Sequence, residues 1–79
     1  MIDCPNWPQG QKATRENMMA YITRLFLYYS ESGGTVGHRA QKAIDSEKEM
    51  SLSALAVKVD QLRDALFDAP PIHLEVDGE

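Results

Sequence analysis

The chain has 79 residues, of which 43% are hydrophobic and 25% are charged, with a net charge of −4 and one cysteine, Cys4. This length fits one small domain, and a single thiol excludes an internal disulfide, so association between chains is the natural additional source of stability. The acidic balance argues against nucleic acid as the main partner, because phosphate contacts require a basic surface.

Residues 1–13 are predicted to form an irregular arm, because Pro5, Pro8 and Gly10 interrupt regular structure. Trp7 lies between the two prolines. We expect it either to fold back onto the domain as an anchor or to insert into a partner, since tryptophan is enriched at binding hot spots. The first residues lack the basic and apolar regions of a leader peptide, and with one free thiol this favours the cytoplasm.

Residues 14–31 are predicted to form the strongest helix, which begins after Thr14 as N-cap and ends before the Gly33-Gly34 pair. Ten of the twelve residues from Met18 to Tyr29 are apolar or aromatic. The main stripe has helical spacing and contains Met18, Ile22, Leu25, Phe26 and Tyr29. With the flanking residues the apolar arc covers roughly 180°, whereas an ordinary surface helix buries ~100°.

Such a wide arc predicts more than one neighbour for this helix. We expect one neighbour within the chain and a second copy of the chain as the other. The predicted homodimer interface consists of Met18, Ile22, Leu25 and Tyr29. Side chains outside the main stripe, including tyrosines suited to a boundary between apolar and polar surroundings, are predicted to bind a partner protein: Trp7, Tyr21, Leu27 and Tyr28.

Residues 36–48 are polar but compatible with a weaker helix. Ser46 followed by Glu49 matches a capping box, which marks the beginning of helices. The pattern permits either a new helix near Ser46 or one long helix from about Val36. We favour two helical segments with a bend or break near residues 45–50.

Residues 50–68 are predicted to form the second strong helix. Its leucines and valine are spaced three and four apart, as in the seam between two helices, at Leu52, Leu55, Val59, Leu62 and Leu66. We expect this stripe to pack antiparallel against the 14–31 helix. The carboxylates of residues 60–68 alternate with Lys58 and Arg63, which is typical of a solvated face.

Residues 69–79 form the predicted extended tail, because Pro70-Pro71 ends the helix. Ile72, Leu74 and Val76 alternate with polar residues, which is strand periodicity. The tail has no evident strand partner in the chain. It is expected either to be docked or disordered, or to pair with another chain by strand addition.

The sequence offers little for catalysis or metal binding. His38, His73 and Cys4 lack the paired spacing that marks zinc sites, so we predict no enzyme activity, no metal and no cofactor. The stretch SLSALAVKVDQL resembles the first helix of helix-turn-helix proteins. It departs from them where a glycine-type turn is expected at Val59-Asp60-Gln61, and the segment after it is acidic rather than basic.

The sequence predicts a single all-α domain over residues 1–79, built as an antiparallel helical hairpin or a small three-helix unit. The length and best apolar stretch exclude a membrane span, which needs ~20 apolar residues. We expect a non-enzymatic homodimer that occludes or bridges a partner protein. In style it resembles accessory or inhibitor proteins of phages and mobile elements. The alternatives are a small structural subunit or assembly chaperone of a larger complex, and an acidic DNA mimic or helix-turn-helix-like regulator.

Overall fold

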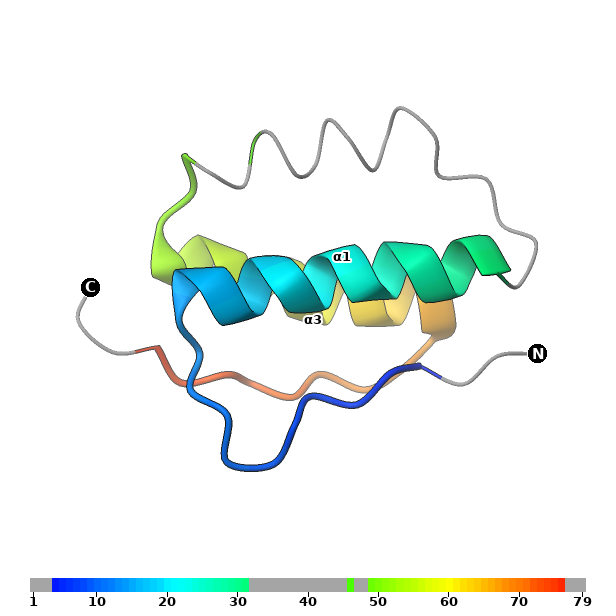
Figure 1. Cartoon of the computed structure of the whole chain (residues 1–79), viewed down its shortest axis with the longest axis horizontal. Helices are drawn as coiled ribbons and strands as arrows, with labels where there is room; N and C mark the ends of the chain where they lie inside the picture. Colours follow the sequence, from blue (N-terminus) through cyan, green and yellow to red (C-terminus); the bar gives the residue numbers. More distant parts are fainter. Residues whose placement is uncertain (1–3, 32–45, 47–48, 77–79) are drawn as a thin grey trace.

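Two α-helices packed against each other form the framework of the computed structural model, which describes residues 4–31, 46 and 49–76 (Figure 1). The first helix, α1, spans Arg15–Glu31, and the other, α3, spans Leu52–Phe67. No strand occurs in these described ranges. The all-α class and the packing of the two strong helices are confirmed. Except for Ser46, the weaker helix predicted at residues 36–48 lies outside the described residues.

Both helices begin with a side-chain cap. The Thr14 hydroxyl accepts a hydrogen bond of 3.1 Å from the Asn17 N–H, which identifies Thr14 as the N-cap of α1. The Ser51 hydroxyl accepts one of 3.1 Å from the Ala54 N–H while the Ser51 backbone is extended. Each cap supplies a partner to a helix N–H that has none within its own helix.

The chain is not helical at residues 49–51, immediately before α3. The Glu49 N–H donates to the Ser46 carbonyl at 3.1 Å, which forms a turn, and Ser51 follows in an extended conformation. Residues 36–68 are therefore not one long helix. The break lies slightly later than the capping box indicated, because Ser51 rather than Ser46 caps α3.

The end of α3 is formed by an aspartate in a conformation that glycine usually adopts. Asp68 has φ 54° and ψ 36°, in the left-handed region. Its N–H donates to the Asp64 carbonyl at 2.9 Å, and the Ala69 N–H donates to the Arg63 carbonyl at 3.1 Å. These bonds satisfy carbonyls in the last turn and direct the chain into the tail.

The two helices run in the same direction, so the antiparallel orientation that we predicted is wrong (Figure 1). Tyr29, near the end of α1, packs edge-to-face on Phe67 at the end of α3, with ring centroids 6.4 Å apart. In an antiparallel pair Tyr29 would lie near the beginning of α3. The prediction was based on the spacing of the apolar residues in the second helix, which indicates the side that packs but not the direction of the neighbouring helix. Instead, the chain leaves one end of the pair after α1 and reaches the other end before α3.

The core lies between the two helices and uses the apolar stripes of both. Five side chains have no exposed surface: Met18, Ile22 and Leu25 of α1, with Leu55 and Val59 of α3. Tyr21, Phe26 and Ala56 complete the buried cluster. The helical spacing in the sequence therefore identified the five fully buried residues, whereas the burial of Tyr21 and Ala56 was not predicted.

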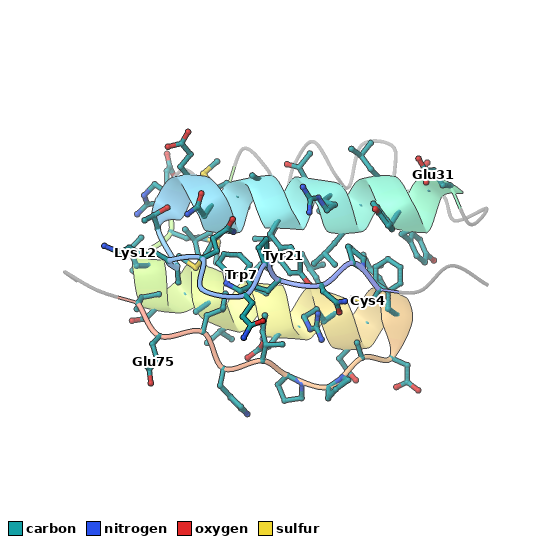
Figure 2. All side chains as sticks on the ribbon, turned by 60° about the horizontal axis from the view of Figure 1, so that its bottom comes forward. Cys4, Trp7, Lys12, Tyr21, Glu31 and Glu75 are labelled. Carbon is teal, nitrogen blue, oxygen red and sulfur yellow. The ribbon has the colours of Figure 1, made fainter. Side chains whose placement is uncertain are left out.

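The segments before α1 and after α3 also pack against this core. Figure 2 shows the N-terminal arm, residues 4–13, crossing the front of the seam between the helices, while residues 69–76 follow α3. In the arm, Pro5 is buried and Trp7 is half-buried. In the tail the half-buried side chains alternate with exposed ones, and they are Ile72, Leu74 and Val76. The apolar arc of α1 is thus covered by the arm and α3 of its own chain.

Candidate functional site

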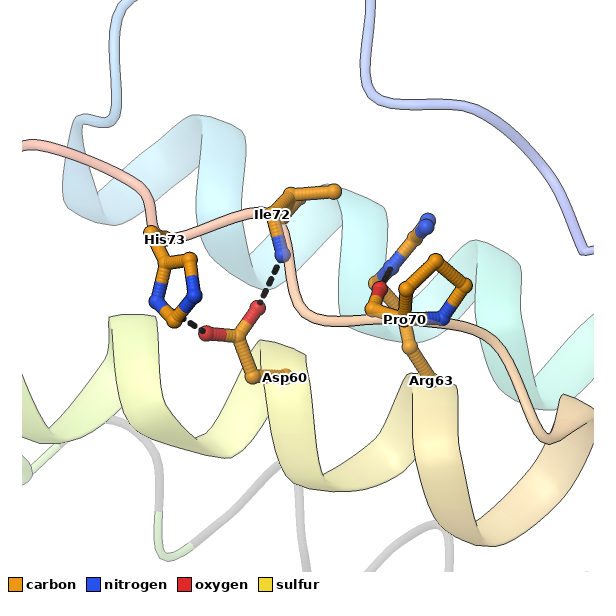
Figure 3. Close-up of polar contacts among 5 residues, drawn as sticks. All are labelled: Asp60, Arg63, Pro70, Ile72 and His73. Atoms are coloured by element: carbon orange, nitrogen blue, oxygen red, sulfur yellow. Dashed lines mark hydrogen bonds and ion pairs between the residues drawn. The ribbon is translucent and has the colours of Figure 1, made fainter.

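A buried arginine joins four segments of the chain at the centre of the molecule. The side chain of Arg63 in α3 is only 7% exposed. Its Nη1 donates to the Tyr21 hydroxyl of α1 at 2.6 Å and to the Cys4 Sγ of the arm at 3.5 Å. Its Nε donates to the Pro70 carbonyl of the tail at 3.1 Å (Figure 3). The Tyr21 hydroxyl in turn donates to the Pro5 carbonyl at 2.5 Å. We call these five residues the Arg63 cluster.

The position of Arg63 corrects the prediction of a solvated charged face around it. Within the described residues the guanidinium contacts a phenol, a thiol and a carbonyl, but no carboxylate. The sequence did contain a signal, because Arg63 follows the core residue Val59 by four positions and so shares its side of the helix. A charged side chain at a core position is buried only when its donors find acceptors.

Burial is the largest influence on the Tyr21 phenol and raises its pKa above the usual value, although the hydrogen bond and positive charge of Arg63 act to lower it. The phenol therefore stays protonated at neutral pH and keeps its donor for the Pro5 carbonyl. All of the cluster's hydrogen bonds join one part of the chain to another. We interpret the Arg63 cluster as the structural link that fixes the arm and the tail on the helices.

Two of the predicted partner-binding residues form part of the domain's own packing. Tyr21 is 3% exposed, so it is a core residue and offers no surface to a partner. Trp7 packs edge-to-face on Tyr21 with ring centroids 5.2 Å apart, and its Nε1 donates to the Gln11 carbonyl at 3.2 Å. Trp7 therefore folds back onto the domain, which was one of the two alternatives for it.

The other two predicted partner-binding residues lie on the surface of α1. Leu27 is 58% exposed and the adjacent Tyr28 is 37% exposed. Their binding role stays a prediction. Val57 of α3 is also exposed, at 54%, and our prediction from the sequence omitted it. The sequence could have indicated that Val57 is exposed, because Val57 falls outside the stripe of leucines on its helix.

The predicted homodimer interface needs correction in three of its four positions. Met18, Ile22 and Leu25 have no exposed surface within the single chain, so they could contact a second copy only if the core opened. The cause is the coverage of α1 by α3 and the arm. Tyr29 is half-buried against Phe67. The homodimer itself stays a prediction.

A groove lies between α3 and the tail, with a volume of about 250 Å³. We call it the tail groove, and it is lined by Ser53, Ala56, Val57, Asp60, His73, Leu74 and Val76. At one end Asp60 Oδ1 accepts from the Ile72 N–H at 2.9 Å, and Asp60 Oδ2 lies 4.0 Å from His73 Nδ1 (Figure 3). His73 is 82% exposed and its φ of 51° is left-handed, which is uncommon for a residue other than glycine.

The helix-turn-helix alternative fails on the course of α3. The helix is continuous from Leu52 to Phe67, so Val59-Asp60-Gln61 lies inside it and forms no turn. A helix-turn-helix motif requires two helices joined by a short turn at such a position. The resemblance of the sequence therefore reflects only the rhythm of an amphipathic helix.

The described residues contain neither a metal-binding cluster nor a helix that could span a membrane. No group of three His, Cys, Asp or Glu side chains there is arranged to hold a metal ion. Neither α1 nor α3 is long and apolar enough to cross a membrane. No family model, curated protein or solved structure matches the chain.

Proposed function

We propose that this chain is a non-enzymatic protein-binding protein whose partner contacts the exposed apolar side chains of Leu27 and Tyr28. The observation that carries the proposal is their exposure, 58% and 37%. Leu27 lies on the side of α1 opposite the core, and Tyr28 lies at the border between the core and the exposed side. The core holds α1 in place, so the two side chains are presented from a rigid element. A binding surface on such an element loses little conformational entropy when a partner docks.

The chemistry of the two residues supports a protein partner. An exposed leucine gains about 25 cal/mol for each Å² of apolar surface that a partner covers. A tyrosine combines an apolar ring with a hydroxyl that stays hydrogen-bonded at the edge of an interface, and tyrosine is enriched in such interfaces. The partner surface that fits this pair is an apolar patch with a polar rim.

The mode of action that we propose is occlusion or bridging of the partner, as in accessory or inhibitor proteins of phages and mobile elements. We propose that the chain acts by covering a surface of its partner. The rival proposal, a structural subunit or assembly chaperone, uses the same two residues but differs in its result. An inhibitor lowers its partner's activity when it binds, whereas an assembly chaperone is released once the larger complex has formed.

The experiment that tests the proposal is affinity capture from a lysate of the source cell with three versions of the full chain. They are the natural chain, the double variant Leu27→Ala with Tyr28→Ala, and the matched control Val57→Ala, which alters an equally exposed residue on α3. We expect one protein to be captured in stoichiometric amount by the natural chain and the control. The double variant should lose it while keeping its helical circular dichroism.

Two results would contradict the proposal. One is capture of the same proteins by all three versions, and the other is the absence of any stoichiometric partner. The proposed homodimer has its own measurement, the molar mass by light scattering at high micromolar concentration. We expect a mass of two chains there, with Tyr29 as the one residue of the predicted interface that keeps exposed surface. A single-chain mass at that concentration would exclude the dimer.

A further inference from the structure

The Arg63 cluster contains a buried positive charge that no carboxylate contacts among the described residues. The Arg63 side chain is only 7% exposed, and its hydrogen bonds go to a phenol, a thiol and a carbonyl. Asp60, three positions earlier on α3, uses its carboxylate for the Ile72 N–H and His73 instead (Figure 3). A buried charge without a counter-charge is costly. An anion beside Arg63 would therefore stabilise the fold.

The guanidinium of Arg63 also has donors that no described residue uses. Its Nε donates to the Pro70 carbonyl, and its Nη1 donates to the Tyr21 hydroxyl and the Cys4 Sγ. No acceptor within residues 4–31, 46 and 49–76 is bonded to Nη2. Arginine presents its donors as a flat fork that fits two oxygens of one anionic group. Arg63 thus has both a charge and a nitrogen available for such a group.

The Cys4 thiol is the group of the cluster that chemistry can convert into an anion with two oxygens. Its Sγ lies 3.5 Å from Arg63 Nη1, and the residue is half-buried rather than enclosed. Tyr21 cannot supply the anion near neutral pH, because burial raises the pKa of its phenol. The two prolines of the cluster contribute only backbone carbonyls. Oxidation of a thiol by a peroxide adds oxygen to sulfur and ends in an acid.

We propose that Cys4 is a peroxide-sensitive modification site whose oxidised sulfur becomes the counter-ion of Arg63. In the first step the sulfur attacks hydrogen peroxide, the O–O bond breaks, and the products are a sulfenic acid and water. A second peroxide molecule oxidises the sulfenic acid to a sulfinic acid, again with water as the product, and this acid releases its proton to solvent. The sulfinate carries one negative charge on two oxygens, which accept hydrogen bonds from Nη1 and Nη2 of Arg63.

The modification strengthens the attachment of the arm to the helices. Cys4 belongs to the arm and Arg63 to α3, so the new ion pair joins two segments that are 59 positions apart. The arm also contacts α1 through Trp7, which packs on Tyr21. Exposure to peroxide therefore fixes the arm more firmly in place. This site uses none of the residues of the proposed function, so either proposal can fail while the other stands.

The test treats the full chain with hydrogen peroxide, removes the excess with catalase and locates the added oxygen by peptide mass spectrometry. We expect Cys4 to gain two oxygen atoms. The urea midpoint should rise by about 1 M, the shift expected when a charge-assisted pair forms in a small domain. Trp7, the one tryptophan of the chain, should become less accessible to acrylamide quenching because the arm is held more firmly.

Two control proteins separate Cys4 from other effects of peroxide. Cys4→Ser has no thiol, so any change in its midpoint reports oxidation elsewhere, and we expect no rise. Cys4→Ser combined with Ser30→Cys moves the thiol to an exposed position on α1. Oxidation of this thiol should leave the midpoint without a rise, because no buried cation is there to pair with it.

A pair of substitutions tests the counter-ion without any oxidant. Cys4→Asp places a carboxylate where the sulfinate would form, and Cys4→Asn is its neutral counterpart of similar shape. We expect the urea midpoint of Cys4→Asp to be higher by about 1 M at pH 7. The difference should shrink as the pH falls below about 4, because the carboxylate is then protonated. Arg63→Met should abolish it at pH 7, and the pH dependence remains a readout should that variant not fold.

Four results would overturn the proposal. One is the absence of added oxygen at Cys4 after peroxide treatment. Another is an unchanged or lower midpoint in the oxidised chain, which would mean that the sulfinate crowds the cluster instead of pairing with Arg63. An equal rise in Cys4→Ser would place the effect outside the thiol. Equal midpoints of Cys4→Asp and Cys4→Asn at pH 7 would show that Arg63 gains nothing from an anion at this position.

Discussion

At the residue scale, the hydroxyl of Tyr21 connects three segments because it accepts from Arg63 and donates to the Pro5 carbonyl. Replacing Tyr21 with Phe keeps the ring in the core but leaves one buried donor and one buried acceptor without this partner. We expect the free energy of unfolding to fall by about 1–3 kcal/mol, the usual cost of unsatisfied buried polar groups. Urea denaturation followed by circular dichroism measures this change.

Tyr28→Phe is the matched control, since it removes a hydroxyl from an exposed tyrosine of the same helix. Its effect should stay within about 0.5 kcal/mol, as for most surface substitutions. A loss in Tyr21→Phe no larger than the loss in Tyr28→Phe would contradict the structural role that we assign to the Arg63 cluster.

The raised pKa of Tyr21 predicts how stability depends on alkaline pH. Burial raises the folded-state pKa, so the folded chain releases the phenolic proton at higher pH than the unfolded chain, whose tyrosine pKa is near the usual 10.0. The stability contribution is fully present below that pH and is lost as the pH rises through the folded-state pKa. We expect the urea midpoint of the natural chain to fall more steeply above pH ~10 than that of Tyr21→Phe. Parallel curves for the two proteins would refute the assignment.

At the scale of the elements, the local signals in the sequence predicted the helices well. Thr14 caps α1 as expected, and the leucine spacing identified the core side of α3. Capping and periodicity depend on residues within a few positions of one another, so a sequence displays them directly. The end of α3 was harder to predict in detail, because Asp68 occupies the left-handed position where glycine is usual.

The conformation of Asp68 predicts opposite responses to glycine at two nearby positions. Asp68→Gly should relieve the left-handed backbone, whereas Asp64→Gly should weaken the helix interior. Both substitutions remove a carboxylate near the same helix end. The difference in stability between the two variants therefore reports the backbone conformation at each position. We expect Asp68→Gly to be more stable than Asp64→Gly by about 1 kcal/mol, measured by thermal and urea denaturation. Equal stabilities would contradict the left-handed assignment.

At the scale of the whole molecule, the sequence did not reveal which distant residues meet. The burial of Arg63 depends on a phenol from α1, a thiol from the arm and a carbonyl from the tail. These partners are separated from Arg63 by up to 59 positions in the chain, and no local pattern encodes such a meeting. For the same reason, Tyr21 and the dimer residues were assigned to surfaces that the arm and α3 cover. The sequence correctly indicated a wide apolar arc on α1, but we expected a second copy of the chain to cover part of it, whereas the arm covers that part.

The parallel direction of α1 and α3 is the global feature most open to direct measurement. Spin labels can be attached to cysteines at exposed positions in a Cys4→Ser background. One pair joins Glu16 to Glu49, and the other joins Ser30 to Glu49. Positions 16 and 30 are about 21 Å apart along α1, and packed helices lie about 8–10 Å apart. Glu49 precedes α3 at the end of the pair where α1 begins, so the 16–49 distance should be shorter by about 10 Å.

Pulsed dipolar spectroscopy gives both distances in frozen solution. An antiparallel pair would reverse their order, because the beginning of α3 would then lie beside the end of α1. The comparison does not depend on the label's own length, which adds to both distances. Circular dichroism and urea midpoints of the labelled chains serve as the control that both pairs report the folded state. A shorter 30–49 distance in folded protein would refute the parallel packing, and with it the contact between Tyr29 and Phe67.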